Sequence, residues 1–182
     1  IKCRISGNKA SAEAGGVYID NSFPTLENCT IADNLSGGRA GGVFLNRRSR
    51  VEMRNNIIAF NKKAGIHTEA YGGYLNISCC NIYGNGTEYS GEGLESMLHT
   101  SGNISGDPVF CGREQGNYTI GDSSPCTENS SPCGEIMGSE EVGCHTRSVT
   151  LVKPDGSGDT ETIQDALDAA ADGDSIFLAP GT

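Results

Sequence analysis

GGVYIDNSFPTLENCTIADN, residues 15–34, contains both landmarks of a repeat that runs through the first half of the chain. The first landmark is a short segment that ends in asparagine. Its four copies are CRISGN at 3–8, CTIADN at 29–34, NIIAFN at 56–61 and CNIYGN at 80–85. The second landmark begins with glycine, and its copies are GGVYIDN at 15–21, GGVFLNR at 41–47 and GIHTEAY at 65–71. Because the final asparagines recur every 24 to 27 residues, the pattern indicates a solenoid with one coil per repeat.

Each coil contains strands of four or five residues in which apolar and polar side chains alternate. The clearest pairs of apolar positions are Val17/Ile19, Val43/Leu45, Val51/Met53 and Leu75/Ile77. One coil buries almost nothing by itself, whereas coils stacked about 4.7–4.9 Å apart pair each strand with its neighbours above and below. We therefore predict an all-β fold, a right-handed parallel β-helix.

The alignment also predicts which residues of successive coils stack. One inward column contains Cys3, Cys29, Asn56 and Cys80, and the next contains Ile5, Ile31, Ile58 and Ile82. The cysteines of this column are expected to be buried thiols, while Cys79 should point outward. At the turn, asparagine tolerates left-handed backbone geometry, and its amide can hydrogen-bond along the stack. The predicted asparagine ladder contains Asn8, Asn34, Asn61 and Asn85.

Two other folds have a comparable period or strand content. A leucine-rich repeat needs the pattern L-x-x-L-x-L and helix-forming segments between its strands, and the repeats contain neither. An antiparallel sandwich gives four units no reason to stay in phase. The constant phase of the repeats therefore favours the β-helix over both alternatives.

The repeats resemble those of secreted bacterial right-handed β-helix proteins of the pectin-lyase-like superfamily. A similar style of repeat occurs in polymorphic outer-membrane adhesins. The resemblance covers about residues 1–110. It implies the fold but no single activity, because the superfamily contains lyases, hydrolases, esterases, adhesins and structural fibres.

The repeat stops after Ile104, and residues 107–144 are rich in Gly, Ser and Pro. This segment resembles the C-terminal cap of such β-helices, which covers unpaired strand edges. It contains half of the eight cysteines, namely Cys111, Cys126, Cys133 and Cys144. Zinc sites usually pair their ligands as C-x₂₋₄-C, a spacing that these cysteines lack. We therefore expect two disulfides among the four, in any of three connectivities, and a first domain at residues 1–145.

Residues 149–182 change character and contain a predicted helix, at about 161–171, between two predicted strands. One apolar helix face contains Ile163, Ala166, Leu167 and Ala170. Thr160 or Thr162 can cap its start, and Gly173 suits its end. The block resembles the start of pectinesterase-like β-helix domains, where a strand and a capping helix precede the first coil. We therefore expect a second β-helix to begin here, so that the chain is an excerpt of a tandem protein or, alternatively, a permuted one.

Bulk composition limits the partners and the location of the protein. The net charge is −10, from 13 basic and 23 acidic residues, which argues against nucleic-acid binding because that requires a basic footprint. No stretch approaches the roughly 18 apolar residues of a membrane span. The expected disulfides favour an oxidising compartment. We predict a secreted or cell-surface protein that is a monomer within a longer chain.

The acidic residues of the coils do not form a column. Asp20 aligns with Asn46, and Asp33 aligns with Phe60. The clustered carboxylates that a polygalacturonase or a Ca²⁺-dependent pectate lyase needs are therefore missing. We predict no catalytic residue in these coils.

Histidines and loop acids offer no stronger site. The histidines are dispersed, at His67, His99 and His145, and His67 should point outward from its strand. Four acids flank Gly-rich turns, and they are Asp155, Asp159, Asp172 and Asp174. Loop oxygens are what Ca²⁺ uses, but turn formation explains these acids more simply. We predict no cofactor and no metal, with Ca²⁺ at these acids as the weaker alternative.

Basic residues cluster between residues 39 and 63, where 7 of the 13 lie. Val51 and Met53 take inward positions, so Arg50 and Arg54 point outward on the same strand. The candidate glycan-binding residues are Arg47, Arg48, Arg50 and Arg54. Guanidinium groups match carboxylate and sulfate in bidentate fashion, although an ordinary solvated loop would have the same composition.

Two functional hypotheses follow. The first is an extracellular or cell-surface β-helix module that binds an acidic polysaccharide, a cell-surface glycan or a protein, or that acts as a rigid spacer. The second is a polysaccharide-acting enzyme of the pectate lyase, polygalacturonase or pectinesterase type whose active coils lie outside this chain. The missing row of acids favours the first hypothesis.

Overall fold

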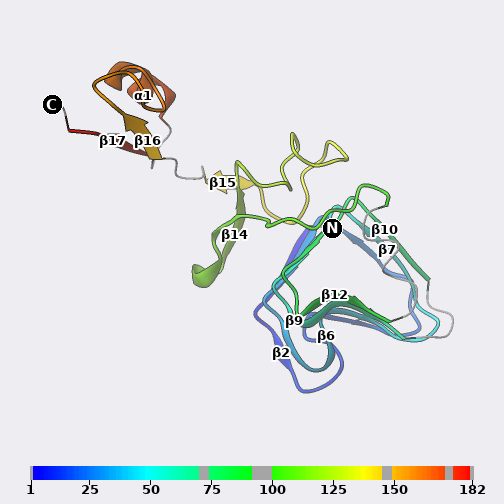
Figure 1. Cartoon of the computed structure of the whole chain (residues 1–182). Coiled ribbons are helices and arrows are strands. Elements are labelled where there is room, and N and C mark those ends of the chain that lie inside the picture. Colours follow the sequence, from blue (N-terminus) through cyan, green and yellow to red (C-terminus); the bar gives the residue numbers. More distant parts are fainter. Residues whose placement is uncertain (1, 70–73, 92–99, 145–148, 171–173, 181–182) are drawn as a thin grey trace.

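The chain folds into a stack of short strands, followed by a loop-rich segment and a small strand–helix–strand unit. The computed structural model describes residues 2–69, 74–91, 100–144, 149–170 and 174–180. Figure 1 shows the strands of the stack superimposed in three groups that form the sides of a triangle. All pairs of strands within these groups are parallel. The all-β, parallel solenoid predicted from the repeat is confirmed.

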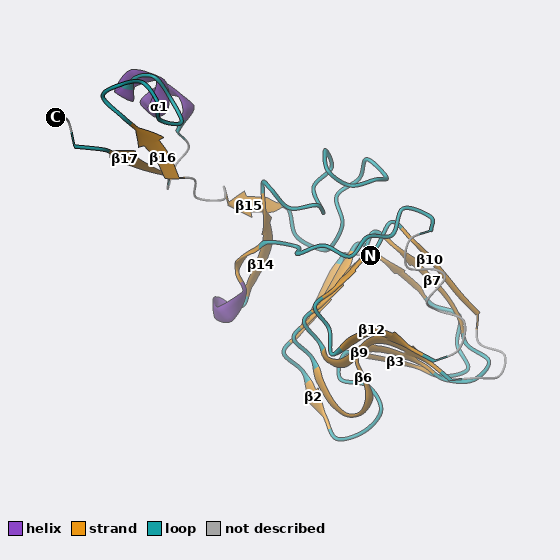
Figure 2. Ribbon diagram, in the orientation of Figure 1, coloured by secondary structure: helices purple, strands orange, loops and turns teal. Residues whose placement is uncertain are grey.

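Each side of the triangle is a separate sheet (Figure 2). The first sheet contains β1 (Cys3–Ser6), β5 (Cys29–Ala32), β8 (Ile57–Ala59) and β11 (Asn81–Tyr83). The second sheet contains β4 (Thr25–Glu27), β7 (Arg50–Arg54) and β10 (Tyr74–Ser78). The third sheet contains β2 (Lys9–Ala10), β3 (Val17–Ile19), β6 (Leu35–Leu45), β9 (Lys62–Thr68) and β12 (Thr87–Ser90).

The strand registers place the predicted apolar columns side by side. In the first sheet, Ile5 pairs with Ile31, which pairs with Ile58 of the next coil. Ile58 in turn pairs with Ile82. The last three are fully buried and share one core with inward residues of the other two sheets. Since burying a side chain of this size stabilises a fold by about 1.5–3 kcal/mol, these columns are the main source of stability of the stack.

The asparagine ladder runs along one corner of the stack. The side-chain amide of Asn8 donates to Oδ1 of Asn34 at 3.0 Å, and Asn34 donates to Asn61 at the same distance. Asn61 continues the ladder to Asn85 at 2.9 Å. The left-handed residue is the one before each ladder position, such as Asp33 with φ of 57°. The ladder pairs buried polar groups between coils and so helps to fix their register.

A second polar column lies on the inner side of the first sheet. The backbone N–H of Cys29 donates to Oδ1 of Asn56 at 2.8 Å, and the N–H of Cys80 donates to Oδ1 of Asn103 at 3.0 Å. Cys29 and Cys80 are buried thiols without a disulfide bond, as predicted. Cys3 is also free but exposed, because it lies on the outermost described strand of this sheet and is covered from one side only. The expectation that Cys3 is buried was wrong.

The loop-rich segment covers the outer face of the first sheet. It contains β13 (Phe110–Gly112), the 3-10 helix η2 (Arg113–Gln115), β14 (Asn117–Gly121) and β15 (Val142–Cys144). Ile57 and Ala59 of β8 point outward, yet they are buried against Ile120 and Met137 of this segment. The predicted end cap therefore lies along the side of the stack, because the outer face of the first sheet is apolar.

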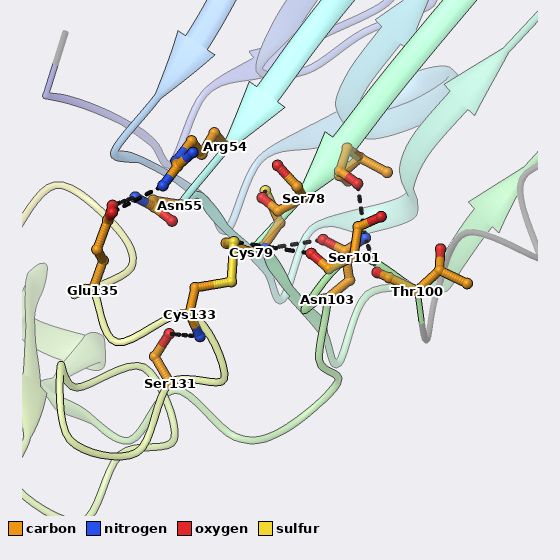
Figure 3. Close-up of a disulfide and its surroundings, with 12 residues drawn as sticks. Arg54, Asn55, Ser78, Cys79, Thr100, Ser101, Asn103, Ser131, Cys133 and Glu135 are labelled. Atoms are coloured by element: carbon orange, nitrogen blue, oxygen red, sulfur yellow. Dashed lines mark hydrogen bonds and ion pairs between the residues drawn. A yellow bond between two sulfur atoms is a disulfide. The ribbon is translucent and has the colours of Figure 1, made fainter.

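Two disulfides fasten the loop-rich segment. Cys111 bonds to Cys144, which is one of the predicted pairs. Cys133 bonds instead to Cys79, the residue that follows β10, across a sequence separation of 54 residues (Figure 3). The prediction that both disulfides lie within the set Cys111, Cys126, Cys133 and Cys144 was therefore wrong, and Cys126 is a free thiol.

The orientation of two side chains explains this difference. Cys79 is adjacent to the inward Cys80 and points outward, to the side where residues 131–135 pass the stack (Figure 3). Cys126 is completely buried against the first sheet, where its sulfur accepts a hydrogen bond from Nδ2 of Asn81 at 3.0 Å. It belongs to the packed interface between segment and sheet, which the spacing of the cysteines could not indicate.

The last unit contains β16 (Val149–Val152), α1 (Ile163–Ala169) and β17 (Ser175–Leu178). Val149 pairs with Ser175 in parallel, an offset of 26 residues that equals the offset between Cys3 and Cys29 in the stack. Thr162 is the N-cap, as its side chain accepts the N–H of Asp165 at 3.0 Å. The pairing offset of the unit is therefore that of one β-helix coil. A second β-helix domain at residues 149–182 stays a prediction. Gly173 lies outside the described residues.

Candidate functional site

A cavity of about 540 Å³ lies on the outer face of the third sheet. Unlike the outer face of the first sheet, this face is not covered by the loop-rich segment, and it presents polar and aromatic side chains. The cavity is lined by Gly38, Arg39, Lys63, Ala64, His67, Gly86, Thr87 and Ser90. These residues come from three successive coils, on β6, β9 and β12 and the turns before them.

A ladder of rings runs along this face, perpendicular to the strands. Tyr18, Phe44 and His67 occupy equivalent outward positions of β3, β6 and β9. The rings of Tyr18 and Phe44 stack with centroids 5.4 Å apart, and those of Phe44 and His67 stack at 5.0 Å. Ser90 continues the ladder, because its Oγ lies 2.6 Å from Nδ1 of His67. Stacked coils thus build a continuous strip from residues that are far apart in sequence.

A difference in coil length creates one wall of the cavity. Val43 lies nine positions after Asn34, whereas Ile66 lies five positions after Asn61 in the next coil. The register between β6 and β9 shifts accordingly, between Leu35 and Val43. The extra residues, including Gly38 and Arg39, have no counterpart in the shorter coil and pack on the preceding coil, where the N–H of Gly38 donates to the carbonyl oxygen of Ala12 at 3.0 Å. Gly38 has no room for a side chain there, since an added Cβ would lie 2.6 Å from Cα of Glu13.

The shorter coil carries local backbone strain at the cavity. Lys63 has φ of 84°, in the left-handed region that side-chain-bearing residues seldom adopt. Such strain costs about 1–3 kcal/mol and is concentrated at functional sites in proteins. The strained turn places Lys63 in the lining of the cavity, together with Arg39.

Charged residues surround the histidine. Arg39 forms ion pairs with Glu13, at 3.9 Å, and with Glu69. Glu69 also lies 3.9 Å from Arg47. Burial of His67, followed by the nearby Arg39 guanidinium, lowers the pKa of the imidazole below its ordinary value, and Glu13 partly opposes this shift. The ring is therefore neutral near neutral pH and can accept a proton.

The four predicted glycan-binding arginines lie on β7 and in the turn before it. Arg47 lies at the ion-paired edge of the cavity, through Glu69. Arg50 and Arg54 point outward from the second sheet, as predicted, and are therefore on a different face. Arg54 is ion-paired at 2.8 Å with Glu135 of the loop-rich segment (Figure 3). Arg48 is in the turn before β7, with φ of 63°.

The remaining predicted polar sites have local explanations where the structure describes them. Oδ1 of Asp155 accepts the N–H and the hydroxyl of Ser157, and Oδ2 of Asp159 accepts the N–H of Leu151. Asp172, His99 and His145 lie outside the described residues. Within the described part of the chain, no three side chains of His, Cys, Asp or Glu are close enough together to hold a metal ion. In the same part, no helix has the length and apolar character needed to cross a membrane.

A second polar cluster joins the loop-rich segment to the first sheet. Arg113 binds Asp33 through Nε and Nη2, at 2.6–3.1 Å, and its guanidinium lies 3.7 Å from the ring centre of Phe60. The hydroxyl of Tyr118 also donates to Asp33, at 2.9 Å. This cluster explains why Asp33 is not part of an acidic site. Its three charged and polar groups satisfy one another and fix the segment on the sheet.

Sequence reasoning placed His67 outward but missed its neighbours in space. Tyr18, Phe44 and His67 occupy one column of the same alignment that revealed the core. Aligning the outward positions as well would have predicted that these three side chains are neighbours. The position of Arg39 depends on how the longer coil folds outward. That geometry is not encoded in the repeat period.

The comparisons with known proteins agree with this architecture. Residues 1–123 match the model of the family described as the right-handed beta helix region. The chain belongs to this right-handed β-helix family. No curated protein and no solved structure gives a significant match. The family defines the fold and its handedness, whereas an activity must be argued from the site.

Proposed function

We propose that the protein is an extracellular or cell-surface β-helix module that binds an acidic carbohydrate along the outer face of the third sheet. The observation that carries this proposal is the strip of stacked rings beside a charged cavity. The three rings lie on successive coils about 4.8 Å apart, so the strip is roughly 10 Å long. An extended chain of sugars fits such a strip better than a compact ligand does.

The exposed ring of Tyr18 supplies the apolar part of the interaction, whereas Phe44 is only 2% exposed and supports this ring by stacking. Tyr18 is 52% exposed, and its hydroxyl accepts a hydrogen bond from Nδ2 of Asn46 at 3.0 Å. The stacking on Phe44 holds the tyrosine ring in place before any ligand arrives. A preformed aromatic surface loses little conformational entropy on binding, and it leaves polar neighbours to determine orientation.

The cavity supplies the charges. Arg39 and Lys63 line it, and Arg47 extends the basic character along its edge. Guanidinium groups bind carboxylate or sulfate in bidentate geometry. Glu13 and Glu69 compensate part of this charge, and the chain as a whole carries −10. Affinity for a polyanion is therefore expected to be modest and to decrease with salt.

The proposed location outside the cytoplasm is supported by the two disulfides. Cys79–Cys133 joins the loop-rich segment to the stack, and Cys111–Cys144 closes a loop within that segment. Structural disulfides persist in oxidising compartments and are rare in the cytosol. They support an extracellular setting, which is also where a carbohydrate ligand of this length is encountered.

The test is retention of the full chain on polygalacturonate and on a sulfated glycan at low salt. Replacing Arg39 by Gln or Tyr18 by Ala should reduce retention at least about tenfold, equivalent to the loss of roughly 1.4 kcal/mol. The matched control is Arg50→Ser, which removes one exposed arginine from the second sheet. It should leave retention unchanged.

Two outcomes would overturn the proposal. The first is that the wild-type chain is not retained on either glycan at low salt. The second is that Arg50→Ser abolishes retention while the Arg39 and Tyr18 variants bind normally. That result would move the site to the second sheet.

A further inference from the structure

The cavity on the third sheet contains a paired hydroxyl and imidazole, Ser90 and His67, at the end of the stacked rings. Oγ of Ser90 lies 2.6 Å from Nδ1 of His67, a distance suited to proton transfer. Both side chains line the cavity of about 540 Å³. A serine becomes a nucleophile when an adjacent base can take its proton. The pair therefore has the geometry of a catalytic dyad that is open to a ligand.

We propose that Ser90 and His67 form a nucleophile–base pair that hydrolyses carboxylic esters bound in this cavity, with small O-acyl groups of a carbohydrate as the substrate class. This activity goes beyond glycan binding and does not depend on it. A small synthetic ester is enough to reveal the reaction.

The neighbours of His67 fix the orientation of its ring and influence its pKa. Stacking on Phe44, with an interplanar angle of 20°, fixes the plane of the ring and keeps Nδ1 directed at Ser90. Arg39 and Glu13 are the charged groups that influence its titration, and Lys63 lines the same cavity. The neutral imidazole accepts the serine proton through Nδ1, and Nε2 then carries the other proton of the imidazolium.

The reaction balances without a cofactor. Oγ of Ser90 attacks the ester carbonyl carbon, and its proton moves to His67. The tetrahedral oxyanion collapses, the bond to the alcohol oxygen breaks, and His67 returns the proton to that oxygen. Water then attacks the acyl-serine, passing one proton to His67, and the carboxylic acid leaves as Ser90 regains its proton. One ester and one water give one acid and one alcohol.

Two cations in the lining can stabilise the oxyanion. Arg39, which is ion-paired with Glu69, and Lys63 line the cavity that also contains the dyad. Donors aimed at a developing negative charge are usually the largest contribution to this chemistry. Gly38, Ala64 and Gly86 have little or no side chain, so the rest of the lining leaves space for an acyl group.

The experiment measures hydrolysis of p-nitrophenyl acetate by the full chain, together with labelling by a fluorophosphonate that traps activated serines. The wild type should turn over the ester and be labelled on Ser90, as located by peptide mapping. Ser90→Ala and His67→Gln should each lower the rate about 100-fold or more. The rate of the wild type should also decrease at acidic pH, as His67 becomes protonated.

The matched control is Ser78→Ala, which removes a serine at the end of β10 on the second sheet and should leave the rate unchanged. Thermal melts of each variant exclude unfolding as the cause of a loss. Glycan retention by Ser90→Ala should persist, which separates this proposal from the binding function. A wild-type rate equal to that of Ser90→Ala, or fluorophosphonate labelling absent from Ser90, overturns the proposal.

Discussion

The same repeat builds the outer faces of the first and third sheets, but the first face is covered and the third remains accessible. On the first sheet, outward Ile57 and Ala59 are apolar and buried under the loop-rich segment. On the third sheet, outward Tyr18 and His67 remain accessible beside a cavity. The inward columns of both sheets are equally apolar and equally buried. The repeat period therefore determines the core, whereas the outward residues decide which face is covered and which is available to a ligand.

The largest expected effect comes from the covered face. Replacing Ile57 by Ala leaves a cavity between β8 and the loop-rich segment and should lower the free energy of unfolding by about 2–5 kcal/mol. The matched change on the accessible face is Tyr18→Ala, which should cost less than about 1 kcal/mol because the ring is half exposed. Urea unfolding measures both. Equal costs would contradict the contrast between the two faces.

The second prediction concerns how the covered face is fastened. Replacing Cys79 and Cys133 together by Ala should lower the free energy of unfolding by about 2–4 kcal/mol, because the disulfide closes a long loop in the unfolded chain. Cys3→Ser is the control, since Cys3 is an exposed free thiol, and it should change nothing measurable. Urea unfolding under non-reducing conditions gives the comparison.

Peptide mapping of the non-reduced protein tests the connectivity directly. Cys126 and Cys80 should be recovered as thiols, and both should resist alkylation in the native state. Burial raises the pKa of Cys126 to about 11 and that of Cys80 to about 12, and the thiolate is the reactive form. Recovery of Cys126 in a disulfide would restore the pairing expected from sequence and contradict the structure.

The difference between the two faces also shows what could be predicted from sequence. Side chains such as Ile31 and Asn34 were placed correctly because every coil repeats the same backbone geometry, so a period of 24 to 27 residues fixes their register. Cys126 was misassigned because its partner depends on which loop crosses which strand. The spacing of cysteines along the chain contains no information about that crossing.

The candidate site was predictable only in part, for a similar reason. His67 was correctly placed outward, and Arg50 and Arg54 were placed on the correct side of β7. Their grouping with Arg47 and Arg48 into one glycan-binding patch stays a prediction. Arg39 joined the site because it lies among the extra residues of a longer coil, which pack on the preceding coil.

The third prediction is a pH effect confined to the accessible face. The pKa of His67 is lowered in the folded state, so between that pKa and the ordinary imidazole value the unfolded chain binds more protons. The free energy of unfolding should therefore increase with pH across this window. Acidification through the same window should lower it again. His67→Gln should flatten this part of the profile. Thermal melts of both proteins from about pH 7 to pH 5 provide the test, and parallel profiles would contradict it.

The smallest expected effect is the ion pair between Arg54 and Glu135, which joins the two regions at the surface. The two atoms are 2.8 Å apart, but both side chains are about half exposed, and solvent screens such pairs. Arg54→Ser should lower the free energy of unfolding by no more than about 1 kcal/mol. A double-mutant cycle with Glu135→Gln isolates the pair from other effects of either substitution.

The small expected change in the free energy of unfolding, together with glycan retention, distinguishes two roles for Arg54. Glu135 also accepts a hydrogen bond from Nδ2 of Asn55, so the carboxylate keeps a partner when Arg54 is removed. If Arg54 only supports the covered face, Arg54→Ser leaves glycan retention unchanged and the coupling energy stays small and salt-dependent. Loss of retention in this variant would instead mean that the arginine exchanges its carboxylate partner for a ligand, and that the second sheet, rather than the third, carries the binding function.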